Sequence, residues 1–182
     1  MKRCSWVNLN NPTYVTYHDK EWGKANFDEA YLFEMLILEA FQAGLSWEIV
    51  LNKREAFRKA YDGFDLEKIL SYDEAKIDEL LNNPDIIRNK LKIRASISNA
   101  KVFKQIEEEF GSFYAYLKGF VGNEIIYEND KTTSEISDKL SKDLKKRGMK
   151  FVGSTTIYSF LQAVGFINSH DDDCFLKKNS LT

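Results

Sequence analysis

The sequence holds few cysteines, which can cross-link the chain, few histidines, which can bind a metal, and few prolines, which interrupt regular secondary structure. It contains two cysteines, two histidines and two prolines among 182 residues. In a cytosolic protein, two cysteines more often indicate a metal site, or no special role, than a disulfide. Charge of one sign is also missing, because 26 basic residues oppose 28 acidic ones and leave a net charge of −2. This balance excludes a globally basic nucleic-acid binder, although it is compatible with separate patches of either sign.

Signals for export and for membrane insertion are missing as well. The N-terminus MKRCSWVNLN has no apolar stretch after its basic residues, so we do not expect a secretory signal. The stretch 151–169 is uncharged, but its Ser, Thr, Gln and Asn residues make it too polar to span a membrane. We therefore expect a cytoplasmic protein without a membrane segment.

Helical periodicity covers most of the chain, and no alternating stretch is long enough to build a sheet. We predict an all-α protein of eight or nine helices. These would form a single domain over residues 1–182, and a division of that domain into two lobes stays open. The expected helices are a short one from Pro12, a buried one between Asp28 and Gly44, and others at about 47–61, 65–70, 73–81, 85–110, 112–120, 134–147 and 154–166.

Several local details of these helices are also predicted. The apolar sides of the helices at 47–61 and 85–110 include Ile49 and Leu91. Ser71 with Glu74 is expected to open the helix at 73–81, and Ser154 is expected to cap the last helix. Residues 121–133 are predicted to form a loop.

Glu39 is the first candidate for a functional residue. It lies in the middle of FEMLILEAFQAGLSW, residues 33–47, which is apolar on every side of a helical wheel and therefore belongs in the interior. A carboxylate there must be paired, raised in pKa or available to a ligand. The alternative is a structural acid bound to a neighbouring loop or arginine. Gly44 and Ser46 place Leu45 and Trp47 in a short corner just beyond this acid.

The N-terminal segment CSWVNLNNPTYVTYHDKEWG is rich in aromatic residues. Tyr14 and Tyr17 lie three residues apart on one helical face, next to a polar run, and are placed to line a cleft. Trp6 precedes them. Trp22 is interpreted as a core residue.

The segment LKKRGMKFVGSTTIYSF, residues 144–160, is typical of a helix-hairpin-helix. Gly148 and Gly153 bracket a tight turn, at which main-chain amides can bind a phosphate. Basic side chains, among them Lys146 and Lys150, would attract DNA, and Ser154 and Thr155 could donate hydroxyl hydrogen bonds. The alternative is a plain corner between two helices with lysines for solubility.

Cys4, His18, His170 and Cys174 are all the cysteines and histidines in the chain. Together they could close a tetrahedral zinc site that joins the two ends of the chain. Because four protein ligands leave no open position, such a zinc would be structural. The alternative is two buried thiols and two ordinary histidines.

The motifs CSWV, YHDKEWG, LFEMLILEAFQAGLSW, RNKLKIRASISNA, SKDLKKRGMKFVGSTT and HDDDC together closely resemble the bacterial 3-methyladenine DNA glycosylase I family. The resemblance covers nearly the whole chain in the expected order. It implies a helix-hairpin-helix glycosylase fold, with the hairpin at about 134–166. It also implies one structural zinc on the four residues above and a base pocket at Glu39, Tyr17 and Trp47, with Trp6 and Tyr14 nearby.

The resemblance implies a repair enzyme that flips 3-methyladenine out of duplex DNA and hydrolyses its N-glycosidic bond without cutting the strand. Tyr17 and Trp47 would stack on the cationic base, and Glu39 would accept hydrogen bonds from its edge. Leu45 and Gln42 would fill the vacated space. We expect double-stranded DNA with alkylated adenine as the partner, free 3-methyladenine as the product, and a monomer.

Two other classes of function compete with this interpretation. A noncatalytic module that binds alkylation damage would use the same hairpin and the same wedge, which is formed by Leu45 and Gln42. A zinc hydrolase is disfavoured by four protein ligands. Many helix-hairpin-helix glycosylases place a catalytic aspartate shortly after the hairpin, but here Asp171, Asp172 and Asp173 lie between presumed zinc ligands, so none of them is assigned a catalytic role.

Overall fold

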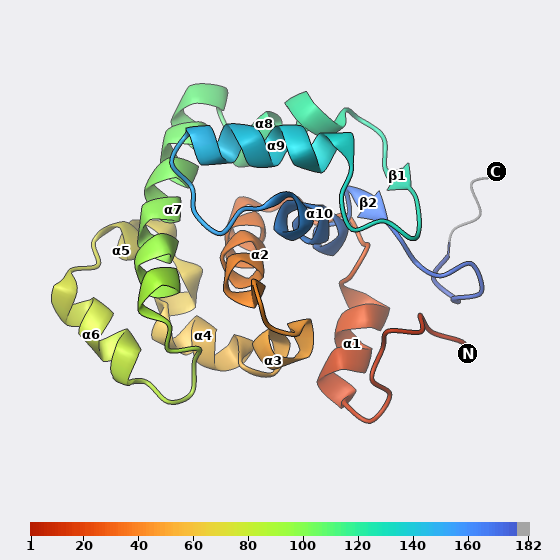
Figure 1. The fold of residues 1–182 in the computed structure, drawn as a ribbon, viewed down its shortest axis with the longest axis horizontal. Helices are drawn as coiled ribbons and strands as arrows, with labels where there is room; N and C mark the ends of the chain where they lie inside the picture. Colours follow the sequence, from red (N-terminus) through yellow and green to blue (C-terminus); the bar gives the residue numbers. More distant parts are fainter. Residues whose placement is uncertain (178–182) are drawn as a thin grey trace.

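The computed structural model describes residues 1–177, and the fold of this part of the chain is dominated by helices (Figure 1). This confirms the all-α prediction. The elements are α1 (Pro12–Lys20), α2 (Glu29–Gln42), α3 (Trp47–Asn52), α4 (Arg54–Ala60), the 3-10 helix η1 (Asp62–Phe64), α5 (Leu66–Leu70), α6 (Glu74–Asn82), α7 (Lys90–Phe110), α8 (Phe113–Val121), β1 (Ile126–Tyr127), α9 (Glu135–Lys146), α10 (Ser154–Ala163) and β2 (Ile167–Asn168). Among the described residues, no helix combines the length and the apolar character needed to cross a membrane.

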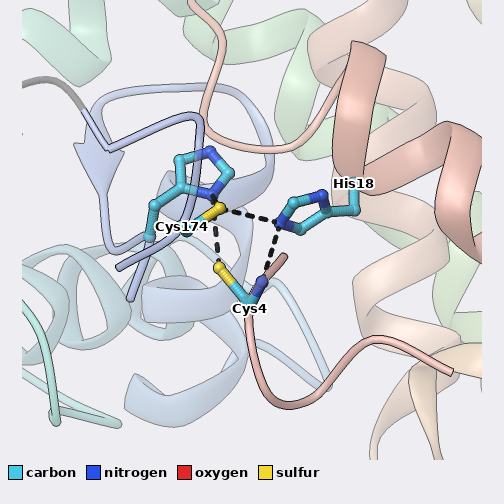
Figure 2. A group of neighbouring side chains, drawn as sticks. Cys4, His18 and Cys174 are labelled. Carbon is cyan, nitrogen blue, oxygen red and sulfur yellow. Dashed lines mark hydrogen bonds between the residues drawn. The ribbon is translucent and has the colours of Figure 1, made fainter. Parts of the chain in front are cut away.

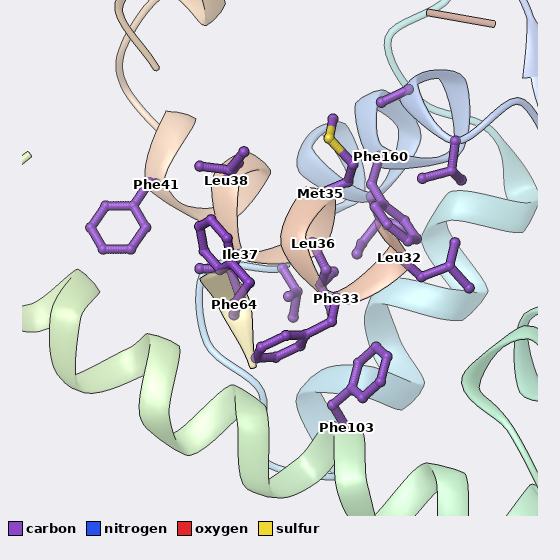
Figure 3. Packing of buried hydrophobic residues seen from close by; sticks show 14 of the residues in the cluster. Leu32, Phe33, Met35, Leu36, Ile37, Leu38, Phe41, Phe64, Phe103 and Phe160 are labelled. Carbon is purple, nitrogen blue, oxygen red and sulfur yellow. The ribbon is translucent and has the colours of Figure 1, made fainter. Parts of the chain in front are cut away.

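Helix α2 lies at the centre, and α3, α7, α8 and α10 pack around it (Figure 1). Its apolar side chains point in several directions, as the all-round apolar sequence predicts, so one helix serves as the core for its neighbours (Figure 3). On one side the ring of Phe33 meets the ring of Phe103 from α7 edge-on, with centroids 5.0 Å apart.

Helix boundaries follow the capping chemistry, with three corrections to the sequence prediction. Asp28 caps α2 as expected, its carboxylate accepting from the Tyr31 amide. Helix α7 begins at Lys90 rather than at residue 85, because Asn89 supplies its N-cap. Helix α6 is capped by Asp73 and not by Ser71, whose hydroxyl instead donates to a carbonyl of the preceding helix. The N-cap of α10 is Gly153 and not Ser154.

The single helix expected at 47–61 is two helices, α3 and α4, which separate at Lys53. Two apolar residues predicted to lie inside are exposed: Ile49 is 44% accessible and Leu91 is 71% accessible. Both lie in the first turn of a helix, where the apolar period gives only a weak indication of which face packs inward.

A small sheet of two short strands corrects one detail, because part of the segment predicted to be a loop forms a strand. β1 comes from the predicted loop at 121–133 and pairs in parallel with β2, which follows α10, so that Ile126 lies opposite Ile167. Two residues per strand are too short to show alternation in sequence. The pairing holds the loop beside the segment that follows α10, and the described residues after β2 lie on the same side of the molecule as the N-terminus (Figure 1).

Candidate functional site

A cavity of about 390 Å³ opens between the N-terminal segment, α1, α2, the start of α3, α10 and the segments that follow β1 and β2. All five side chains that the sequence predicts for base recognition line it. They are Trp6, Tyr14, Tyr17, Glu39 and Trp47. The volume lies in the range of small-molecule sites.

Glu39 lies on this cavity with 3% of its surface exposed. No described residue makes a hydrogen bond or ion pair with its carboxyl group, so the alternative of a satisfied structural acid is wrong within residues 1–177. Burial raises the pKa of Glu39 to about 8, since the charged form loses its hydration. The carboxyl group is therefore mostly protonated near neutral pH in the free protein, and it is available to a ligand.

Aromatic rings form the walls of the cavity. The rings of Tyr17 and Trp47 lie 5.4 Å apart at 46°, and those of Trp6 and Tyr14 lie 5.4 Å apart at 55°. Burial, reinforced by the charge of Glu39, raises the pKa of Tyr17 well above its ordinary value, so its hydroxyl keeps its proton. The indole Nε1 of Trp47 is buried without a hydrogen-bond acceptor in the described chain. These walls offer both stacking faces and a free donor.

The cavity includes residues that the sequence prediction missed. Trp22 was interpreted as core; it is buried, but it also lines the cavity, and its membership of YHDKEWG was the available signal. Seven more lining residues come from three separate segments, and no local pattern indicates them. They are Ser5, Asp130, Lys131, Ser159, Gln162, Ser169 and Asp171.

The four predicted metal ligands meet at the ends of the chain. Cys4, His18, His170 and Cys174 are all buried, and their donor atoms lie within 4.8 Å of one another, so this group could hold a metal ion. Cys4 Sγ lies 3.4 Å from His170 Nδ1. Cys174 Sγ lies 3.5 Å from His18 Nε2 (Figure 2).

Neighbouring groups orient and polarise these ligands. His18 Nδ1 lies 2.8 Å from Asp19 Oδ1, which leaves Nε2 directed at the sulfur of Cys174. Burial raises the pKa of Cys4 to about 12 and lowers that of His170 to about 4. The surroundings thus favour a neutral histidine, as metal ligation requires, while thiolates there need a cation.

The predicted hairpin is formed by α9, the turn at 147–153 and α10. Gly148 adopts φ +106°, in the region that favours glycine. Asn99 of α7 holds the turn by accepting from the Lys150 amide and donating to its carbonyl. The hydroxyl of Ser154 donates to Asp138, so it is used inside the hairpin and is not the free donor expected from the sequence. Lys146, Lys150 and Thr155 are exposed.

A buried lysine connects the hairpin with the corner after α2. Lys92 Nζ donates to the carbonyl of Phe41 at 2.8 Å and also to that of Ala43, at the C-terminal end of α2. It lies 5.9 Å from the ring centroid of Phe151 in the hairpin turn. Within the corner, Gln42 Nε2 donates to the carbonyl of Leu45 at 3.0 Å. Gln42 lines the cavity, and Leu45 lies just outside it, half-buried.

A sequence model of the family described as methyladenine glycosylase matches residues 6–177. The chain belongs to this family. The match includes three of the four metal-ligand positions and every residue of the cavity except Ser5.

Individual methyladenine glycosylases are similar to the chain over nearly its full length. The DNA-3-methyladenine glycosylase 1 of Escherichia coli strain K12 is 44% identical over 180 residues, which cover 96% of each chain. A crystal structure of 3-methyladenine DNA glycosylase I has a TM-score of 0.93 at 43% identity, and the match covers 97% of this chain and 100% of that one. A variant of 3-methyladenine DNA glycosylase I solved in complex with 3-methyladenine has a TM-score of 0.92 at 34% identity, with 98% and 99% covered.

Proposed function

We propose that this methyladenine glycosylase removes 3-methyladenine from duplex DNA by base flipping and hydrolysis of the N-glycosidic bond, without cutting the strand. The observation that carries the proposal is the cavity on which a buried carboxyl group, free of protein partners, lies among aromatic rings. A protein interior does not retain an unpaired acid for stability, because burial disfavours its charged form.

The chemistry requires selection more than acid catalysis. Adenine methylated at N3 and still attached to its sugar is a cation, so its bond to C1′ is already weakened. When that bond breaks, the electron pair stays with the base, which leaves as a neutral molecule, and the positive charge passes to the sugar at C1′. Water adds to C1′ and releases one proton to the solvent, which completes the hydrolysis. No proton has to be delivered to the leaving group.

Glu39, Tyr17 and Trp47 can perform this selection. A cationic base lowers the pKa of a neighbouring carboxyl group, so its arrival favours the ionised form of Glu39. The resulting carboxylate accepts hydrogen bonds from the edge of the base, and the electron-rich faces of Tyr17 and Trp47 attract the positive ring. Trp6 and Tyr14 complete the walls. Unmodified adenine is neutral, so it gains none of the binding energy that depends on the positive charge of the base.

The hairpin would hold the DNA backbone. No described residue accepts hydrogen bonds from the first amides of α10, so those of Ser154 and Thr155 can bind a phosphate next to Gly148 and Gly153. Lys146 and Lys150 add positive charge at the same turn. Leu45, with Gln42 behind it, would enter the space that the flipped base leaves.

The metal would be one structural zinc ion. Zn–S bonds of about 2.3 Å and Zn–N bonds of about 2.0 Å in a tetrahedron place sulfur and nitrogen about 3.5 Å apart. Three S···N separations in the group, from Cys4 to His170 and from Cys174 to both histidines, are 3.4 to 3.6 Å and fit this geometry. Zinc bound there would stabilise two thiolates and join the chain ends, and it would leave no position for substrate. A monomeric state and a cytoplasmic location remain predictions from the sequence.

Base-release analysis tests the proposed function. Duplex DNA treated with a methylating agent is incubated with the protein, and the released bases are separated by chromatography while strand length is followed on a gel. We expect free 3-methyladenine and intact strands. Tight binding to the methylated duplex without released base would instead support the noncatalytic damage-binding module.

A further inference from the structure

Asp171 occupies a different position from the two aspartates that follow it. It is half-buried and lines the base cavity. Its Oδ2 accepts a hydrogen bond from the Ser5 amide at 2.6 Å, and its own amide lies 3.3 Å from Cys4 Sγ. Asp172 and Asp173 are exposed, and they pair with Lys177 and Lys2. Only the first member of the acidic triplet therefore faces the cavity.

The charges around the cavity favour a cationic ligand. Four ionisable acidic or basic side chains besides the tyrosines line it: Glu39, Asp130, Lys131 and Asp171. The ammonium of Lys131 already pairs with Glu128. Asp130 is exposed to solvent, which screens its charge, whereas Asp171 is held against the cavity wall.

The fixation of Asp171 matters for its effect on a ligand. A carboxylate that keeps one position does not have to be ordered when the ligand arrives, so less conformational entropy is lost on binding. The Ser5 amide engages one oxygen and leaves the other oxygen of the carboxylate able to accept a hydrogen bond.

We propose that Asp171 is a specificity-determining residue of the base cavity, whose fixed carboxylate stabilises the cationic form of a flipped purine and thereby favours N3-alkylated over unmodified adenine. This inference rests on the proposed glycosylase function. It gives the first aspartate of HDDDC a role that differs from those of its neighbours.

The test compares two small probes by calorimetric titration of the metal-loaded protein. One is 3,9-dimethyladeninium, a permanent cation in which a methyl group replaces the sugar, and the other is neutral 3-methyladenine. Asp171→Asn removes the charge but keeps an oxygen that can accept from the Ser5 amide. Asp173→Asn is the matched control, with the same charge change two residues away on the solvent side. Metal content is measured for each variant.

We expect Asp171→Asn to weaken binding of the cation about tenfold, the size of a unit-charge interaction at an intermediate effective dielectric. The affinity of this variant for neutral 3-methyladenine should change less than about twofold. Asp173→Asn should change the affinity for either probe by less than about twofold, because the charge of Asp173 is screened by solvent. Asp171→Glu, which restores the charge, should recover part of the loss.

Three results would overturn the inference: unchanged affinity for the cation in Asp171→Asn, equal weakening of both probes, or the same loss in Asp173→Asn. If Asp171→Asn does not fold, Asp171→Ser provides a second neutral variant with a hydroxyl acceptor for the Ser5 amide. Base release by the unsubstituted protein is measured in parallel. Its absence would refute the proposed function, whereas normal release together with any of these three results would refute only the role of Asp171.

Discussion

Replacing Glu39 by glutamine should make the protein more stable and less active at the same time. Glu39 is 3% exposed and has no hydrogen-bond partner among the described residues, and burial raises its pKa from 4.5 to about 8. The folded state therefore holds a proton at this position over a pH range in which the unfolded chain has already lost it. Glutamine has nearly the same shape, stays neutral at every pH and leaves no charge to be neutralised.

The sign and size of the stability effect follow from proton linkage. Between pH 4.5 and about 8 the folded state binds more protons at Glu39 than the unfolded state, so this residue lowers the free energy of unfolding as the pH rises. Glu39→Gln removes this decrease in the free energy of unfolding. We expect the variant to be more stable by about 1 kcal/mol near pH 5.5, about 3 kcal/mol near pH 7 and about 5 kcal/mol near pH 9.

Denaturant unfolding of the two proteins with equal metal content, at these three pH values, measures the difference directly. Glu34→Gln is a matched control in the same helix, because Glu34 lies 2.6 Å from Arg54 Nε and 2.9 Å from Arg58 Nε. Breaking that buried network should destabilise the protein, by about 3 kcal/mol. The two Glu→Gln changes are thus expected to have opposite signs.

Base release should fall about 10- to 100-fold in Glu39→Gln, since a charge-assisted hydrogen bond to the substrate is lost. A stability difference that does not change with pH would refute the assignment of a raised pKa to Glu39. Unchanged base release would remove Glu39 from the mechanism, whatever its effect on stability.

The remaining predictions concern the hairpin, the metal and the wedge. Replacing Lys146 and Lys150 by alanine should weaken DNA binding for all sequences and reduce the slope of log affinity against log salt by about 2. The control Lys139→Ala, two turns earlier in α9, should leave this slope unchanged. Fluorescence anisotropy at several salt concentrations measures the slope for each variant. Cys174→Ala should reduce zinc content and lower the unfolding midpoint by several degrees, as shown by metal analysis and thermal melts, and an equally stable zinc-free protein would contradict a structural metal. Leu45→Ala should slow base release from duplex DNA about tenfold while binding of free 3-methyladenine stays the same, because only flipping needs the wedge; equal losses in both assays would place Leu45 in the base cavity.

The sequence by itself determined the central helix and the composition of the functional site. A segment that is apolar on all sides can only be interior, which makes α2 the core and places Glu39 inside. The motifs at both ends of the chain and around α2 identify the family. Trp6, Tyr14, Tyr17 and Trp47 were expected near that acid from the same motifs, and the structure places them on one cavity.

Only the tertiary structure decided which buried acid is free. Glu34 and Glu39 lie five residues apart in α2 and look alike in sequence, but Arg54 and Arg58, which fold back from α4, pair with the first and not with the second. The position of Asp171 on the cavity could not be predicted from the sequence either.

Asp171 lines the cavity from the segment just after β2, which pairs with β1, and the N-terminal segment comes close enough for the Ser5 amide to bind its carboxylate. The physical reason is the same in each case. Helical periodicity and capping act over a few residues, whereas the partner of a buried charge and the wall of a cavity come from segments that are distant in sequence and meet only after folding.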